Sequence, residues 1–176
     1  WIHGNEQTAR AVLIEHIRNF QGRAFLIENS DRNIPIHGGL LDPNRMFSST
    51  GAYRNLRTQN PGWSEAQVVT AVTRLEKDRP QFLKTILPTN GGLLLALHNN
   101  SQGYSALDEV PISDSVSLKK PGEPHEFILC TQKSDFMRLA ESNFNVLLQN
   151  RVPLTDDGSL SRLAAARGVR YVNIEA

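Results

Sequence analysis

Residues 91–100 read GGLLLALHNN: two glycines, five apolar residues without a break, then a histidine and two asparagines. A continuous apolar run of this length, bounded by residues that favour turns, predicts a central strand covered on both faces. We therefore expect a strand over Leu93–Leu97 that ends at His98. In open α/β sheets, ligands bind beyond the carboxyl ends of the strands, so His98 is a candidate functional residue.

On both sides of this run, helical patterns alternate with short apolar stretches. The expected helices are Glu6–Phe20, a helix from Ser64 that Pro80 breaks or kinks, Ser134–Glu141, and Ser159–Arg167 with Gly168 behind it. The other expected strands are Ala24–Ile27, Glu126–Thr131, Phe144–Leu148 and Val169–Glu175. Residues 29–61 and 101–124 are polar and lack a sustained period, so we expect two long loops there.

This alternation predicts one α/β domain with a mostly parallel, mixed central sheet and helices on both faces. No internal repeat and no Pro/Gly-rich linker divides residues 1–176, so a single domain is expected. The chain begins inside an apolar stub that reads as a strand. We therefore expect this strand to be truncated at its N-terminal end.

Charge and composition exclude two classes of partner. Lys+Arg 19 against Asp+Glu 18 gives a net charge of +1, which offers no electrostatic basis for binding nucleic acid or an anionic membrane surface. The longest apolar stretch, Leu93–Leu97, is too short to span a bilayer. The single cysteine, Cys130, lies in an apolar run and is expected to be a buried structural thiol rather than a nucleophile.

Three side chains that can bind a metal or move a proton end predicted strands: His3, His98 and Glu175. Glu6 follows His3 at a strand-to-helix turn, where Gly4 is expected to allow a sharp bend. Two imidazoles and a carboxylate are ligands that catalytic zinc sites use while a further position stays open for water. Taken singly, each residue also fits an ordinary role, such as a hydrogen-bonded histidine or a solvated strand end.

Four segments in the same order resemble the zinc carboxypeptidase-like superfamily, and within it the aspartoacylase and succinylglutamate desuccinylase branch. Ile2–Glu6 resembles the signature H-G-[ND]-E, Leu41–Phe47 resembles D-L-N-R-x-F, Leu97–Asn100 resembles L-H-N-T, and Tyr171–Glu175 resembles the strand that ends in the catalytic glutamate. Pro43 and Asn100 depart from the leucine and threonine of that branch. These departures bear on the substrate more than on the metal.

The resemblance implies one zinc ion per chain, bound by His3, Glu6 and His98. It also implies that Glu175 is the general base, which takes a proton from the attacking water and passes it to the leaving amine. The chemistry is consistent with these roles, because zinc lowers the pKa of a bound water and a nearby carboxylate can shuttle its proton.

By the same resemblance, Asn44 and Arg45 hold a substrate carboxylate, which a guanidinium can bind through two parallel hydrogen bonds. Arg32 is the only arginine of residues 29–61 that precedes Arg45, and it would polarise the substrate carbonyl. The expected function is a zinc-dependent hydrolase of an amide bond next to a free carboxylate, in a small peptide or an N-acyl amino acid. Two alternatives stay open: a non-catalytic ligand-binding domain on the same fold, and a zinc-free α/β domain whose motifs match by coincidence.

Overall fold

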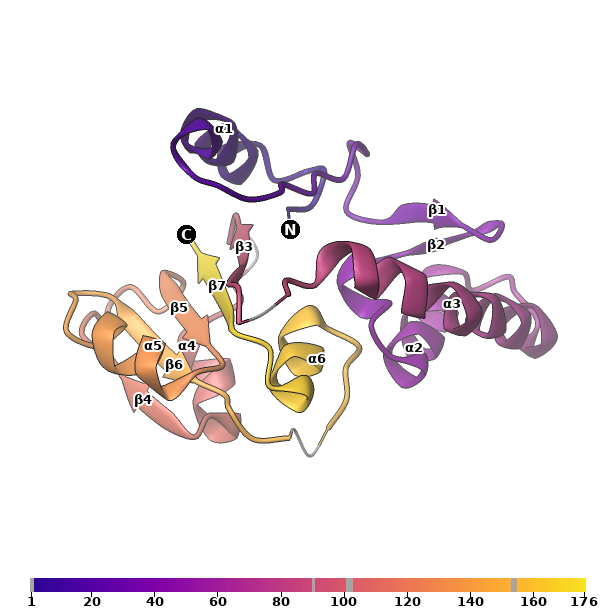
Figure 1. Cartoon of the computed structure of the whole chain (residues 1–176). Helices are drawn as coiled ribbons and strands as arrows, with labels where there is room; N and C mark the ends of the chain where they lie inside the picture. The colour runs from indigo at the N-terminus through magenta and orange to yellow at the C-terminus, as the bar shows by residue number, and fades with distance from the viewer. Residues whose placement is uncertain (1, 90, 101–102, 153–154) are drawn as a thin grey trace.

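A five-stranded mixed sheet forms the centre of one α/β domain in the computed structural model (Figure 1). The structure describes residues 2–89, 91–100, 103–152 and 155–176. Trp1 of the expected N-terminal strand and residues 101–102 of the second expected loop therefore lie outside the described residues. In spatial order, the strands are β3 (Leu94–His98), β7 (Tyr171–Glu175), β5 (Phe127–Cys130), β6 (Asn145–Leu148) and β4 (Ser115–Ser117).

Two pairs of neighbouring strands are parallel and two are antiparallel. β3 pairs with β7 and β5 with β6 in parallel, whereas β7–β5 and β6–β4 are antiparallel. The prediction of a mixed α/β sheet is confirmed, but the sheet is not mostly parallel. Apolar strand patterns carry no information on strand direction, and this is why the sequence did not reveal the antiparallel pairs.

Six α-helices and three short 3₁₀ helices are present in the described part of the chain. The α-helices are α1 (Gln7–His16), α2 (Ser49–Gln59), α3 (Glu65–Ile86), α4 (Ala106–Glu109), α5 (Lys133–Leu139) and α6 (Leu160–Arg167). The 3₁₀ helices are η1 (Ile17–Asn19), η2 (Pro43–Arg45) and η3 (Val110–Ile112). Ser64 caps α3 and Gly168 ends α6 at φ 63°, both as expected. None of the helices described is long and apolar enough to cross a membrane.

Several expected elements differ in the structure. Residues 29–61 are no loop: they hold a hairpin of β1 (Ile34–Ile36) and β2 (Gly39–Leu41), then η2 and α2. The described part of 101–124 likewise holds α4, η3 and β4. Ala24–Ile27 is not a strand, because only Leu26 bridges to another segment, at Ile2. Of the break or kink expected at Pro80, the break does not occur, since α3 continues to Ile86.

Helices cover both faces of the sheet, as expected. On one face, β3, β5, β6 and β7 pack against α6 and the last turns of α3, with Leu94, Tyr171, Leu160 and Ile86 all buried. On the other face, α5 packs over β5 and β6. Cys130 is buried there, and this burial raises the pKa of its thiol to about 12. Leu95 is 38% exposed, so β3 is not covered on both faces along its whole length.

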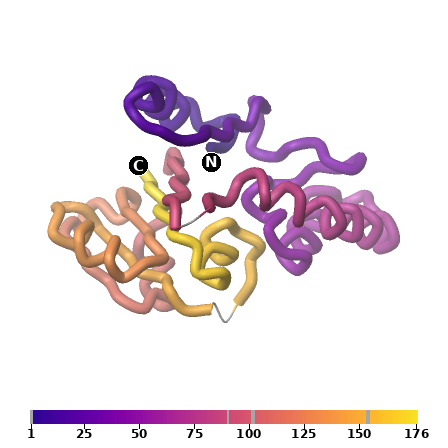
Figure 2. Tube along the Cα trace, in the orientation of Figure 1, coloured from indigo at the N-terminus to yellow at the C-terminus, as the bar shows by residue number. Residues whose placement is uncertain are grey.

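A second apolar cluster joins α2 and α3 to the β1–β2 hairpin, and it includes Leu41, Leu56 and Val72. This cluster fixes the end of β2, from which the chain enters η2. The segment that begins at Ile2 and leads into α1 lies across the carboxyl ends of β3 and β7 (Figures 1 and 2). Three parts of the chain therefore meet at one end of the sheet: the N-terminal segment, the β2–η2 segment, and the ends of β3 and β7.

Candidate metal centre

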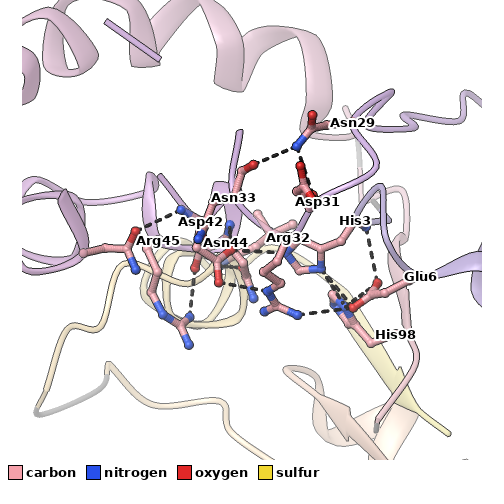
Figure 3. A network of polar contacts seen from close by, with 12 residues as sticks. His3, Glu6, Asn29, Asp31, Arg32, Asn33, Asp42, Asn44, Arg45 and His98 are labelled. Atoms are coloured by element: carbon pink, nitrogen blue, oxygen red, sulfur yellow. Dashed lines mark hydrogen bonds and ion pairs between the residues drawn. The ribbon is translucent and has the colours of Figure 1, made fainter. Parts of the chain in front are cut away.

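His3, Glu6 and His98 converge on one buried point at this end of the sheet (Figure 3). Nδ1 of His3 lies 3.1 Å from Oε1 of Glu6 and 3.2 Å from Nδ1 of His98. Nδ1 of His98 lies 3.0 Å from each carboxylate oxygen of Glu6. All three residues are buried, so the two nitrogens and one oxygen form a nearly equilateral triangle away from bulk water.

This triangle has the dimensions of a metal site. In a tetrahedral zinc site with bonds of about 2.0–2.1 Å, two donor atoms lie roughly 3.3–3.4 Å apart. The observed separations of 3.0–3.2 Å are slightly shorter, and an ion above the triangle would keep a coordination position open. The His3–Glu6–His98 group could therefore hold a metal ion, as predicted for these three residues.

Each of the three side chains is positioned by its own local structure. His98 is the last residue of β3 and shares a face with the buried residues Leu94 and Ala96. Glu6 occupies the N-cap position of α1 but makes no cap hydrogen bond, so its carboxylate is free to face the histidines. Asn99 joins the two elements, because its side-chain oxygen accepts a 3.1 Å hydrogen bond from the backbone N–H of Ala9.

Gly4 is required for a reason that differs from the expected one. Its φ is not positive, so the turn between His3 and Glu6 does not need the backbone freedom of glycine. Instead, a Cβ on Gly4 would lie 1.5 Å from the carbonyl oxygen of Asn29. The glycine therefore allows residues 28–30 to approach the backbone that carries the first two ligands.

Asp42 is a further member of the site, and the sequence analysis gave it no role. Its Oδ1 lies 3.3 Å from Nε2 of His3, an ion-pair distance rather than a well-aligned hydrogen bond. A carboxylate at Nε2 favours the tautomer whose Nδ1 lone pair faces the other ligands. Oδ1 of Asp42 accepts a 2.8 Å hydrogen bond from the backbone N–H of Asn44. The backbone N–H of Asp42 itself donates a 2.9 Å hydrogen bond to Oδ1 of Asn55.

The ionisation of each group in the centre depends strongly on the charges of its neighbours. Burial alone would raise the pKa of Glu6, but hydrogen bonds to His3 and His98 outweigh it and lower the pKa to about 2. Burial also opposes ionisation of Asp42, yet contact with His3 and the charge of Arg32 hold its pKa well below the usual range. For His3, burial acts to lower the pKa, and the two carboxylates more than reverse this, so that the pKa is raised. Two ionised carboxylates thus face the imidazoles, which favours a bound cation.

Glu175 ends β7, next to the candidate ligand His98. It is the register partner of His98 on the adjacent parallel strand, so both side chains project from the same face of the sheet. Burial raises the pKa of Glu175, and the charge of His98 and a 2.8 Å hydrogen bond from Asn173 Nδ2 offset this only in part. A buried carboxylate with a raised pKa is suited to accept and return a proton near neutral pH.

Arg32 reaches the centre from the segment before β1. Its Nη1 lies 3.4 Å from Oε1 of Glu6, and its Nε donates a 3.1 Å hydrogen bond to Oδ2 of Asp42 (Figure 3). Its side chain is 43% exposed, so the guanidinium is open to solvent on its other side. The arginine thus connects the carboxylates of Glu6 and Asp42 and leaves donors for an incoming molecule.

Asn44 and Arg45 lie on η2, directly after Asp42. The side-chain oxygen of Asn44 accepts a 2.9 Å hydrogen bond from the backbone N–H of Leu160 at the start of α6. Arg45 donates from Nη1 to the carbonyl oxygen of Asn44 at 2.9 Å and lies 3.5 Å from Oδ2 of Asp157. Its carboxylate partner Asp157 is half-exposed, so a substrate carboxylate could replace it.

A scan against protein-family models, a search of curated proteins and a search of solved structures each found no match to this chain. The resemblance of the four ordered segments to a family therefore rests on the sequence alone.

Proposed function

We propose that this chain is a zinc-dependent hydrolase that cleaves an amide bond next to a free carboxylate. One observation supports this above the others: the buried His3–Glu6–His98 triangle has Glu175 beside it, in register with His98. The family that the four segments resemble places zinc ligands and a general base at these four positions. The proposal also includes a zinc carboxypeptidase-like fold, which is more specific than a single α/β domain with a mixed sheet.

The donor set fits zinc. Two imidazole nitrogens and one carboxylate oxygen match the borderline preference of this ion and leave a coordination position open. When bound there, zinc would polarise a carbonyl and lower the pKa of a water molecule. Asp42 would keep His3 oriented toward the ion, as carboxylates behind zinc-bound histidines generally do.

Glu175 would act as the base. Its carboxylate accepts a proton from the attacking water and later delivers this proton to the nitrogen of the leaving amine. The raised pKa of Glu175 makes its carboxylate a stronger base toward the attacking water, which assists the first transfer. Asn173 holds one carboxylate oxygen at 2.8 Å and thus limits the orientations that Glu175 can adopt.

Two arginines would recognise the substrate. Arg45 would bind the free carboxylate through its planar fork, in exchange for its contact with Asp157. The remaining donors of Arg32 would face the scissile carbonyl and stabilise negative charge on its oxygen as the water adds. The substrate class that follows is a small peptide with a free C-terminus or an N-acyl amino acid.

Metal analysis combined with a substrate panel tests this proposal. Protein purified without chelators is expected to contain close to one zinc per chain and to hydrolyse N-acyl amino acids or C-terminal peptide bonds. His98→Ala should lose both the metal and the activity. Unchanged hydrolysis in a zinc-free His98→Ala protein would refute the mechanism. Equal inactivity of the parent protein and Glu175→Gln, with measurable ligand binding in both, would instead indicate a binding domain.

A further inference from the structure

A cavity lies at the end of β3 and β7 that is opposite to the candidate metal centre. It has a volume of about 560 Å³ and is lined by the C-terminal half of α3, the residues after it, and Arg167 at the end of α6. α3 precedes β3 in the chain and α6 precedes β7, so the cavity lies toward the amino ends of these strands. The candidate metal centre lies at their carboxyl ends, so the two sites are separate.

The cavity carries an excess of positive charge. Three cationic side chains line it, from Arg79, Lys84 and Arg167, against one carboxylate, from Glu76. The Glu76 carboxylate already accepts a hydrogen bond from the Ser49 hydroxyl. Within the described part of the chain, Lys84 and Arg167 form no ion pair. Two positive charges therefore lack a matching negative charge in the lining.

Arg79 is the best-anchored of these cations and is incompletely satisfied. Its Nε donates to the carbonyl oxygen of Met46 at 2.9 Å, and its Nη1 donates to Oγ of Ser49 at 3.3 Å. Its Nη2 is buried and has no hydrogen-bond acceptor among the described residues. Glu76 and Asp156 attract this guanidinium only from beyond ion-pair distance, and burial lowers its pKa. A buried donor without an acceptor is rare and costly, and the positive charge of this guanidinium would attract an anion in the cavity.

Apart from Thr89, the rest of the lining is apolar. Leu83, Leu87 and Pro88 contribute a hydrophobic wall beside the cationic groups. The volume falls within the range of about 300–1,000 Å³ that is typical of small-molecule sites. A bare inorganic anion would use the charge and leave most of this wall without contact.

We propose that this cavity binds a small organic molecule that carries a phosphate group, with Arg79, Lys84 and Arg167 facing the phosphate and the apolar wall contacting the organic part. A phosphate monoester carries close to two negative charges above pH 7, which matches the two uncompensated positive charges better than one carboxylate would. Arginine also binds phosphate oxygens through two parallel hydrogen bonds.

Titration calorimetry of the purified protein with phenyl phosphate and with inorganic phosphate, at constant ionic strength, tests this site. Lys84→Gln and Arg167→Gln are the informative variants, because both side chains are exposed, and we expect both variants to fold as the parent does. Each is expected to weaken the binding of phenyl phosphate by about threefold or more, and the double variant by about tenfold. Phenyl phosphate should bind more tightly than inorganic phosphate.

Two controls assign the binding to this cavity. Arg54→Gln removes an exposed arginine outside the lining and should leave the affinity unchanged. Arg45→Gln removes the proposed substrate-binding arginine and should also leave it unchanged. The inference is overturned by absence of saturable binding, by unchanged affinity in the double variant, or by loss of binding in Arg45→Gln alone. Equal affinities for the two ligands would overturn the role of the apolar wall.

Discussion

His98 and Glu175 are register partners at the ends of two parallel strands, so the backbone hydrogen bonds of the sheet set the spacing between a candidate metal ligand and the carboxylate beside it. Neither residue depends on a flexible loop for its position. A site built on paired strands holds its groups more precisely than one built on loops. The separate roles proposed for the two side chains can therefore be tested by substituting one without displacing the other.

Glu175→Gln should abolish most hydrolysis and leave metal binding intact. The amide has the shape of the carboxylate but cannot accept the proton of the attacking water. We expect the rate to fall roughly 10²–10⁴-fold. Metal content by mass spectrometry should equal that of the parent protein. A variant that loses its metal together with its activity would assign Glu175 to the metal ligands rather than to the base.

Asp42→Asn should weaken metal binding about 10–100-fold without removing any of the three ligands. The amide can no longer hold His3 through a charged contact at Nε2, so the Nδ1 lone pair is less well directed. Competition with a chromophoric chelator measures the affinity. Asp108→Asn is a suitable control, because this carboxylate caps α4 and does not contact the centre. Equal affinities of Asp42→Asn and the parent would show that the contact has no such role.

Metal affinity should decrease as the pH falls. A protonated imidazole cannot bind a metal, and the pKa of His3 in the metal-free protein is raised above its ordinary value of 6.5. The carboxylate of Glu6 stays ionised down to about pH 2 and does not limit binding first. Chelator competition between pH 5 and 8 should therefore show that the metal affinity decreases once the pH drops below the raised pKa of His3. A metal affinity that stays constant between pH 5 and 8 would contradict the competition between protons and the metal for His3.

In the metal-free protein, the effect of His3 on fold stability should have the opposite pH dependence, so that low pH favours the folded state. Because its folded pKa is raised, His3 stabilises the fold below pH 6.5, and this contribution is lost as the pH rises through the folded pKa. For Glu6 the folded pKa is lowered from 4.5 to about 2, so its contribution is present above pH 4.5 and lost as the pH falls toward 2. Urea unfolding after chelation should thus give greatest stability between these limits.

Arg45→Gln should raise the KM for substrates with a free carboxylate by about 10–100-fold, because a charge-assisted hydrogen bond of roughly 1.5–3 kcal/mol is lost. The same substrate with its carboxylate amidated is the matched control and should be affected little. Arg54→Gln, at an exposed position of α2, should behave as the parent. If the variant loses activity equally on both substrates, Arg45 does not recognise the carboxylate.

Gly4→Ala should destabilise the protein by about 3 kcal/mol or more, since the new methyl group would overlap the carbonyl oxygen of Asn29. Metal affinity should fall with it, because Gly4 lies between His3 and Glu6. Gly22→Ala is the control: its Cβ would meet no atom within 4 Å. Urea midpoints of the two variants give the comparison. Equal midpoints would mean that residues 28–30 do not pack as described.

His3, His98 and Glu175 could be predicted as candidate site residues because each ends a short apolar stretch, and Glu6 because it follows His3 within one motif. His98 and Glu175 end strands that the structure also contains, and His3 follows Ile2, which bridges to Leu26 instead of joining the sheet. Asp42 was within a recognised motif, yet its contact with His3 depends on how the hairpin folds back, which no local pattern encodes.

The segments that sequence could not assign have weak apolar patterns. α2 buries Gly51, Ala52 and Leu56, so its buried face holds only one large apolar side chain and lacks the apolar stripe by which a helix is recognised in a sequence. Gly51 allows Gly158 to pack against it, since a Cβ there would lie 2.2 Å from the Cα of Gly158. Strands of three residues, such as β1 and β4, are also too short to show alternation.

Among the described strands, β3 pairs only with β7. His98 therefore reaches its final position only after the strand at the far end of the chain has docked beside it. Contacts between residues so distant in sequence form late and slow the folding of a domain. Metal uptake during refolding should for this reason follow, rather than precede, formation of the helices, and the rate of metal capture would report the final step of folding.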